Sequence, residues 1–439
     1  MKYQKLTQTA PTTLLIVLII ISCFAAPTAI SAEESSFHFG GALRYNYRYM
    51  DWEDESYARV NKDQGGEFLL DTYRINVDGT YKGIDLSLEY RFYSGYNMLH
   101  HGYFGYAFDD RNQIQLGVSQ KPFGIQPYAS HNWFFSIAYY IGLEDNYDGG
   151  LKFIHMDGPW SVQLAFYKNS GGNYTGTSDV SSRYSYDIVP EMSGISWITG
   201  QVSNNREDNQ FNGRVAYTMT HDESSKTELG VSGEYGMLYN GALARLNDMD
   251  PADAAALYTG DTDPWGNHFA IGGHVNGTYG SFNLMAFVIY TQADPKTLNE
   301  ENLTAAGAAD GYQPDFGDSL VVYGAYDFPY TVASKGWILA FEPAYTVTVN
   351  WGPITSLQFY NDFSVYLKSD DRFSAQTDIQ PTFHNITGVL VTAGKVYTYV
   401  DIAQGKNNPW LGNYTNGLAA GNPDAEWKMR FNINFGYYF

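Results

Sequence analysis

Six cationic residues near the two ends of the chain could attract anions if their side chains faced one polar space. They are Arg44, Arg48, Arg74, Arg91, Lys428 and Arg430. Each lies in a stretch where polar and apolar residues alternate, and in an extended strand such alternation sends the polar side chains to one face. If the strands that carry them are neighbours in one sheet, the six charges form a single surface, which we call the basic wall.

Carboxylates are predicted to face the same interior. They are Asp78, Asp85 and Glu89 on the strands of the basic wall, and Glu228, Glu234, Glu342, Asp362 and Asp401 on other strands. Basic and acidic residues on facing walls would create a transverse field that favours polar solutes over apolar ones. Alternatively, the charges pair with close neighbours, which offsets the cost of removing them from water.

The residue types that perform catalysis are scattered. The nine His residues include one adjacent pair, His100-His101, which we place in a solvated loop beside Gly102. No HExxH motif, no Gly-x-Ser-x-Gly elbow and no Cys/His metal spacing occurs. The sequence therefore predicts no catalytic residue, no metal site and no cofactor, and the chain is not expected to be an enzyme.

The last fifteen residues, AEWKMRFNINFGYYF at 425–439, show what kind of strand carries these charges. Apolar or aromatic residues occupy every second position, from Trp427 to Phe439. A tilted strand needs roughly 9–11 residues to cross a bilayer, with lipid on one face and water on the other. An aromatic last residue resembles the end of bacterial outer-membrane barrels, which the barrel-assembly machinery recognises, so Phe439 is predicted to be an assembly signal.

The N-terminus predicts export. Lys2 and Lys5 precede an apolar run, and small residues follow as far as Ala32, which is typical of a cleaved secretory signal peptide over 1–32. Residues 33–439 are then the barrel, and after residue 32 no stretch approaches the ~20 apolar residues of a membrane-spanning helix. An alternative interpretation makes Cys23 a lipidated N-terminus.

The mature chain is acidic. The full chain has 26 basic and 47 acidic residues, and loss of Lys2 and Lys5 leaves 24 against 47, a formal charge of −23. Nucleic acid is therefore excluded as a partner. The acidic residues concentrate between the predicted strands, where they are either solvated or bridged by divalent cations to lipopolysaccharide.

Turn and loop signals predict the number of strands. Short turns are expected at 81–83, 109–112, 157–159, 221–223, 279–280, 351–353 and 393–395. Longer loops are expected at 51–66, 94–100, 120–147, 169–206, 241–264, 293–334, 369–380 and 405–424. Seven turns and eight loops join sixteen strands of an all-β, antiparallel transmembrane barrel, with 14 or 18 strands as alternatives. Residues 319–332 fit no wall strand and form either a folded-back loop or a hairpin with an unidentified partner.

The third long loop, 120–147, is rich in aromatic residues, which would promote non-specific association if they were exposed. We expect it to fold into the barrel, although packing against neighbouring loops is the alternative. The segment LGVSQKPFG at 116–124 resembles the one that precedes the constriction loop in phosphate-selective O/P-type porins. This resemblance implies a trimeric, sixteen-stranded diffusion channel, with Lys121, Glu144, Asp145 and Asp148 at the constriction. It does not carry over phosphate selectivity, because residues 122–151 contain no Lys or Arg.

These observations predict an outer-membrane porin of a Gram-negative bacterium that lets small hydrophilic solutes or ions diffuse passively. One alternative is a substrate-specific channel for phosphate, other anions or sugars, since tyrosine rings can stack on sugar rings. Another is a fatty-acid-type transporter, but this needs an N-terminal plug and only Glu33 to Ser36 precede the first predicted strand. A barrel adhesin or an outer-membrane hydrolase is a third class.

Overall fold

The computed structural model of the chain describes residues 35–52, 61–170, 182–190, 202–315, 317–369, 372–373, 377–412 and 416–439. The expected signal peptide and Cys23 lie outside these residues. No helix within the described ranges has the length and apolar character that a membrane-spanning helix requires.

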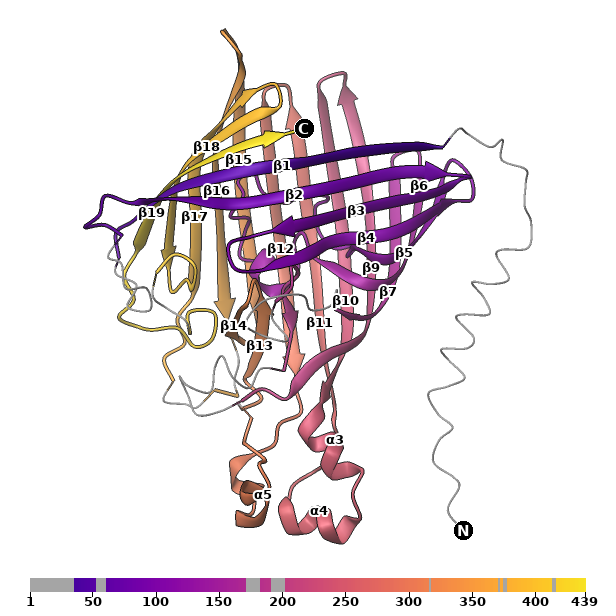
Figure 1. Ribbon diagram of the computed structural model, residues 1–439, viewed down its shortest axis with the longest axis vertical. Coiled ribbons are helices and arrows are strands. Elements are labelled where there is room, and N and C mark those ends of the chain that lie inside the picture. Colours follow the sequence, from indigo (N-terminus) through magenta and orange to yellow (C-terminus); the bar gives the residue numbers. More distant parts are fainter. Residues whose placement is uncertain are drawn as a thin grey trace.

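Sixteen antiparallel strands close into one barrel (Figure 1). The first eight in chain order are β1 (Ser36–Met50), β2 (Glu67–Tyr81), β3 (Ile84–Phe92), β4 (Asn97–Ala107), β5 (Asn112–Gln120), β6 (Tyr147–Asp157), β7 (Trp160–Ser170) and β9 (Asn205–Asp222). The other eight are β10 (Ser225–Asn240), β11 (Trp265–Tyr279), β12 (Phe282–Asp294), β15 (Lys335–Trp351), β16 (Ile354–Lys368), β17 (Thr382–Ala393), β18 (Val396–Lys406) and β19 (Lys428–Tyr438). The prediction of a sixteen-stranded, all-β antiparallel barrel is confirmed.

The two faces of the wall differ in exposure as the alternation predicts. Outward-facing Phe39 is 71% exposed and Trp351 is 62% exposed, whereas inward-facing Asp401 and Asn432 are fully buried. Large apolar side chains on the outside suit a hydrocarbon environment, and polar side chains on the inside need partners or water. The period-two pattern therefore determines which side of each strand faces the lumen.

The barrel closes where β19 pairs with β1, from Ala42 opposite Tyr438 to Met50 opposite Arg430. Phe439 extends this pairing beyond the strand: its backbone N–H donates to the carbonyl oxygen of Gly41 at 3.1 Å, and the N–H of Gly41 donates back at 3.2 Å. The last residue of the chain is thus part of the closing seam.

The connections follow the predicted rhythm. All seven short turns join the strands as expected, and they lie at the end of the barrel opposite the helices (Figure 1). The connection predicted at 94–100 is present, but its predicted bounds are wrong. β4 already begins at Asn97, so the connection is the short 93–96 turn. Short helices that the sequence did not predict lie in the long connections: α3 (Gly241–Asn247), α4 (Pro251–Leu257), α5 (Ala305–Ala309), η1 (Tyr139–Ile141) and η2 (Glu300–Asn302).

The segment without a place in the wall forms a second, smaller sheet. β13 (Leu320–Ala325) and β14 (Phe328–Ala333) make a hairpin, and β13 also pairs with β8 (Asp187–Ile188). Of the two alternatives for residues 319–332, the hairpin is therefore correct. We call β8, β13 and β14 the internal sheet, since its residues share one buried cluster with inward-facing residues of the wall strands.

Candidate pore and its infolded segments

The basic wall lies on β1, β2, β3 and β19, which are adjacent in the barrel. A guanidinium nitrogen of Arg44 lies 2.6 Å from a carboxylate oxygen of Asp71. Arg48 pairs with Glu67 at the same distance. Arg44 and Arg48 of β1 are therefore paired with carboxylates of the adjacent strand β2. Asp71 was not singled out in the sequence, because a β-bulge between Arg44 and Tyr45 shifts the register beside it.

Arg74 and Arg91 share one carboxylate. Arg74 lies 3.4 Å from Glu89, and Arg91 also pairs with Glu89 through its Nε. All three side chains are less than a tenth exposed. Lys428 differs: its ammonium pairs with the exposed Glu426 at 3.2 Å, at the loop end of β19. Four of the wall's cations therefore have acidic partners on their own strand or on a neighbouring strand.

Aromatic rings cover the guanidinium groups of the basic wall. Trp133 of the third loop lies over Arg44 at 5.3 Å and over Arg430 at 5.7 Å, measured from guanidinium carbon to ring centroid. Tyr184 covers Arg91 at 4.5 Å. Contacts of this kind are attractive and exclude water from the charge. Infolded residues therefore cover Arg44, Arg91 and Arg430 of the basic wall.

Glu144 organises the third loop from within. It accepts hydrogen bonds from the backbone N–H of Ala129 and Ser136 and from the hydroxyl groups of Ser130 and Ser136, at 2.6–3.2 Å. Burial raises the pKa of Glu144, and these hydrogen bonds oppose that effect. The carboxylate therefore serves as an internal tie for the loop rather than as a free charge in solution.

The same loop is anchored on the opposite wall. Asp362 of β16 accepts hydrogen bonds from His131 N–H at 2.7 Å and from the Asn132 side-chain amide at 2.6 Å. Nearby, the Ile137 N–H donates to the hydroxyl of Ser364 at 3.0 Å. Residues 121–146 begin at β5, so contacts with β16 require the loop to cross the interior of the barrel.

Asp145 ties the third loop to the segment that precedes β8. It accepts hydrogen bonds from the Tyr147 hydroxyl at 2.9 Å and from the Tyr184 hydroxyl at 2.5 Å. Burial raises the pKa of Asp145 to about 7, although the Tyr184 hydrogen bond and the Arg91 charge lower it. The protonation of this carboxyl group is therefore sensitive to pH near neutrality.

Lys121, at the start of the loop, is buried among carboxylates. Its ammonium lies 2.9 Å from Glu234 and 3.8 Å from Asp148. Although burial disfavours the charged ammonium, these carboxylates raise the pKa of Lys121 above its ordinary value. The structure thus brings Lys121 and Asp148 together, but places Glu144 and Asp145 in separate hydrogen-bond networks.

The third loop and the internal sheet pack against each other through aromatic rings. The Tyr139 hydroxyl lies 2.7 Å from that of Tyr326, and Tyr330 donates to the backbone oxygen of Tyr140. Trp410, from the last long connection, stacks on Tyr140 with ring centroids 5.6 Å apart. Three infolded segments therefore form one cluster inside the barrel.

The expectation that His100 and His101 lie in a solvated loop is wrong. Both belong to β4, and His100 is only 3% exposed. Its Nδ1 lies 2.7 Å from the Nδ1 of His101, and its ring contacts Tyr147 and Tyr184 at centroid distances of 4.3 and 4.2 Å. The chain already turns at 93–96, where Gly95 adopts a left-handed backbone, so the strand resumes before the histidine pair.

A polar hollow of about 430 Å³ remains between the inner faces of β1 to β5, near the short-turn end. Its lining includes His38, Asp78, Asp85, Ser87, Tyr103 and Gln113. Asp78 and Asp85 face this hollow, away from the covered arginines, so the accessible part of this wall is acidic.

Comparisons with known proteins give structural matches only. No protein-family model and no curated protein matches the chain. The outer-membrane-expressed OmpT of Vibrio cholerae is 12% identical with a TM-score of 0.48, over 93% of this chain and 99% of that one. An anion-selective porin from Comamonas acidovorans is 11% identical with a TM-score of 0.49, over 92% and 100%. OprD of Pseudomonas aeruginosa is 11% identical with a TM-score of 0.40, over 94% and 97%. At these identities the matches assign neither a family nor a solute.

Proposed function

We propose that this chain is an outer-membrane channel through which small hydrophilic solutes or ions diffuse passively. The observation that carries the proposal is the closed sixteen-stranded wall, with exposed apolar side chains outside and polar or charged ones inside. A wall of this kind satisfies its backbone hydrogen bonds within a bilayer and encloses a polar path.

The infolded segments support a narrow path. The third loop and the internal sheet bury inward-facing residues such as Tyr366, Asp401 and Asn432 completely. Solutes would therefore pass through a restricted part of the lumen, and the polar hollow beside β1 to β5 is its vestibule. We expect a small conductance compared with that of an open barrel of sixteen strands.

Weak ion selectivity follows from the pairing of charges. Arg44 and Arg48 each have a carboxylate partner, and Arg74 and Arg91 share Glu89, so three carboxylates offset most of the charge of these four arginines. The resemblance of residues 116–124 to O/P-type porins supports the channel architecture, whereas selectivity for phosphate would need unpaired cations at the constriction. The alternative is a channel specific for phosphate, other anions or sugars. Measuring which solutes pass through or block the channel distinguishes the two.

The remaining features of the proposal concern assembly. We propose that the chain is exported by a cleaved signal peptide over 1–32, that Phe439 is recognised by the barrel-assembly machinery, and that three copies associate in the membrane. Lipopolysaccharide and outer-membrane lipid would surround the apolar outer face. A catalytic role is not part of the proposal.

The test is reconstitution of the purified protein in a planar bilayer under a salt gradient. We expect ohmic channels of small conductance and a reversal potential near zero. The double substitution Arg44→Ala and Arg48→Ala should move the reversal potential toward cations, because Asp71 and Glu67 lose their partners. Lys82→Ala, in the exposed turn between β2 and β3, is the control. Absence of any current would refute the channel, and a current blocked by phosphate would replace weak selectivity with phosphate recognition.

A further inference from the structure

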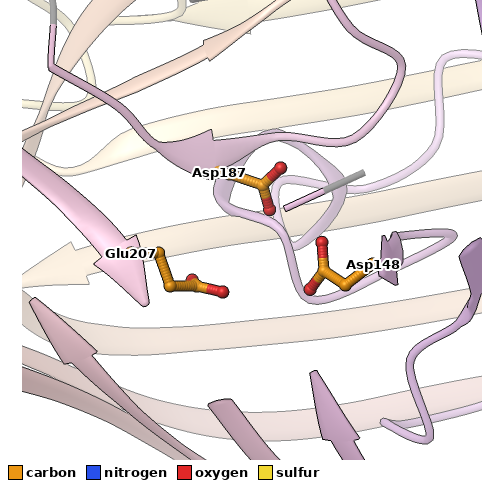
Figure 2. A group of neighbouring side chains, drawn as sticks. All are labelled: Asp148, Asp187 and Glu207. Atoms are coloured by element: carbon orange, nitrogen blue, oxygen red, sulfur yellow. The ribbon is translucent and has the colours of Figure 1, made fainter. Parts of the chain in front are cut away.

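Three buried carboxylates meet where the internal sheet touches the barrel wall. Asp148 comes from β6, Asp187 from β8 and Glu207 from β9, and one oxygen of each lies within 4.8 Å of the others. Their exposures are 0%, 1% and 7%. Figure 2 shows the carboxylate groups of Asp148 and Asp187 turned toward each other, with that of Glu207 directed toward the same space. We call this group the carboxylate triad.

Two permanent cations lie beside the triad. The Lys121 ammonium is 3.8 Å from Asp148 but closer, at 2.9 Å, to a fourth carboxylate, Glu234. Arg183 pairs with Asp187 at 3.3 Å. If all four carboxyl groups were ionised, they would face two permanent positive charges, an excess of two negative charges.

Among the described residues, His268 of β11 also faces the triad, and Tyr323 and Tyr167 interact electrostatically with the same carboxylates. The Nε2 of His268 lies 3.1 Å from Glu207, and its Nδ1 lies 3.7 Å from Glu234. A protonated His268 would neutralise one of the two excess charges. The second excess charge must then be neutralised by a proton or by a bound cation, because burial of an unpaired charge is strongly unfavourable.

Two oxygen atoms of the triad have no hydrogen-bond partner within the part of the chain that the structure describes. These are Oδ1 of Asp148 and Oδ1 of Asp187, both buried. The other oxygen of each side chain contacts Lys121 or Arg183. One oxygen of each of these two carboxylates thus contacts a cationic side chain, and the second oxygen is available to coordinate a metal ion.

We propose that the carboxylate triad binds one divalent cation that prefers oxygen ligands, Ca²⁺ or Mg²⁺. Converging carboxylate oxygens are the ligands that these ions take in proteins. A dication would remove the excess negative charge, and coordination would occupy the two oxygens that lack hydrogen bonds. Because Asp187 belongs to β8 while Asp148 and Glu207 belong to the wall, the bound ion would fasten the internal sheet to the barrel.

This position gives the ion a role in conduction, an extension that rests on the proposed channel function. In the internal sheet β13 lies between β14 and β8. β14 continues through Ser334 into wall strand β15, so its edge is held covalently, and the triad would hold the opposite edge, β8. Without the ion, repulsion among the carboxylates would weaken that attachment. The sheet would then leave its place more often, and the path through the barrel would widen.

Ion binding is tested directly on protein refolded in detergent without lipopolysaccharide and dialysed against EDTA. Calorimetric titration with Ca²⁺, and separately with Mg²⁺, should show one saturable site per chain for at least one of the ions. Asp187→Asn and Glu207→Gln should each weaken that site at least tenfold. Asp208→Asn is the matched control, because Asp208 is the next residue on β9 and pairs with the exposed Lys168 instead.

Each variant must have the wild-type β content by circular dichroism. If one of the two triad variants does not fold, the other one is used for the test. Absence of saturable binding of both ions to the wild-type chain would refute the site. Equal binding by wild type, Asp187→Asn and Glu207→Gln would place the ion elsewhere. Neither result depends on whether the barrel conducts, so failure of the site is distinct from failure of the channel.

The conduction role is tested in planar bilayers at constant ionic strength. EDTA should raise the mean conductance of the wild-type channel several-fold, and added Ca²⁺ or Mg²⁺ should restore it. Asp187→Asn should conduct at one level with or without EDTA, because it removes both a ligand of the ion and one of the charges that repel each other. Asp208→Asn should behave like wild type. If the triad binds an ion but EDTA leaves the wild-type conductance unchanged, the ion does not control the path.

Discussion

Asp362 is predicted to hold the third loop across the barrel, and its removal should open the path. Asp362→Ala deletes a buried carboxylate that accepts four hydrogen bonds, from the N–H groups of His131 and Asn132, from Nδ1 of His131 and from the Asn132 side-chain amide. Hydrogen bonds to charged groups contribute about 1.5–3 kcal/mol each, so the loss of several of them should cost at least about 3 kcal/mol. Since about 1.4 kcal/mol changes an equilibrium tenfold, the undocked loop should become at least about 10² times more populated.

The assay is single-channel recording combined with limited proteolysis. Asp362→Ala should show more frequent or longer visits to levels of higher conductance, and cleavage within residues 121–146 should be faster. Asn361→Ala is the control, because Asn361 is the preceding residue on β16 and hydrogen bonds to Asn385 and Thr387 of the neighbouring strand. If folded Asp362→Ala channels keep wild-type conductance and protease resistance, the loop is not held by this contact.

Two further predictions concern pH and the closing seam. Burial raises the pKa of Asp145 to about 7, from an ordinary value near 4. Its neutral form therefore stabilises the infolded state at low pH, and this contribution is lost as the pH rises from about 4 through about 7. In EDTA, conductance should therefore increase from pH 5 to pH 8, and a fall over this range would contradict the assignment. At the seam, a side-chain carbon at Gly41 would lie 2.3 Å from the carbonyl oxygen of Arg74 and 2.8 Å from the Phe439 ring. Gly41→Val should lower the midpoint of thermal unfolding and the yield of folded barrel, measured by circular dichroism, and an unchanged midpoint would show that the seam adapts.

The wall of the barrel could be predicted because its signals are local. Alternation in 425–439 reports two different solvents on the two faces of one strand, and turn residues such as Lys82-Gly83 report where the chain reverses. Neither signal depends on distant parts of the chain. The strand count, the closing pair of strands and the inward face of the basic wall follow from such signals.

The internal sheet could not be assigned because its signals are weak or distant. The hairpin turns at Tyr326 and Asp327, which both adopt a left-handed backbone, whereas the strongest sequence signal for such a turn is Asn-Gly. Its third strand, β8, has only two residues and lies more than 130 positions earlier in the chain. The anchor between His131 and Asp362 likewise joins residues 231 positions apart, a contact that no local pattern reports.

The infolded segments give the lumen the energetics of a protein core rather than those of an open pore. A guanidinium group such as that of Arg91 lies beneath Tyr184 and beside Glu89, so it is stabilised by partners that arrive from both the wall and the inserted chain. Withdrawal of the inserted chain would return these charges to water, which lowers their desolvation cost and offsets part of the lost packing. Charged walls of this kind make the infolded state easier to reverse than an apolar core of equal size would be. The selectivity of the channel should therefore depend on how far the third loop and the internal sheet are inserted, and a variant that loosens them should change conductance and ion preference together.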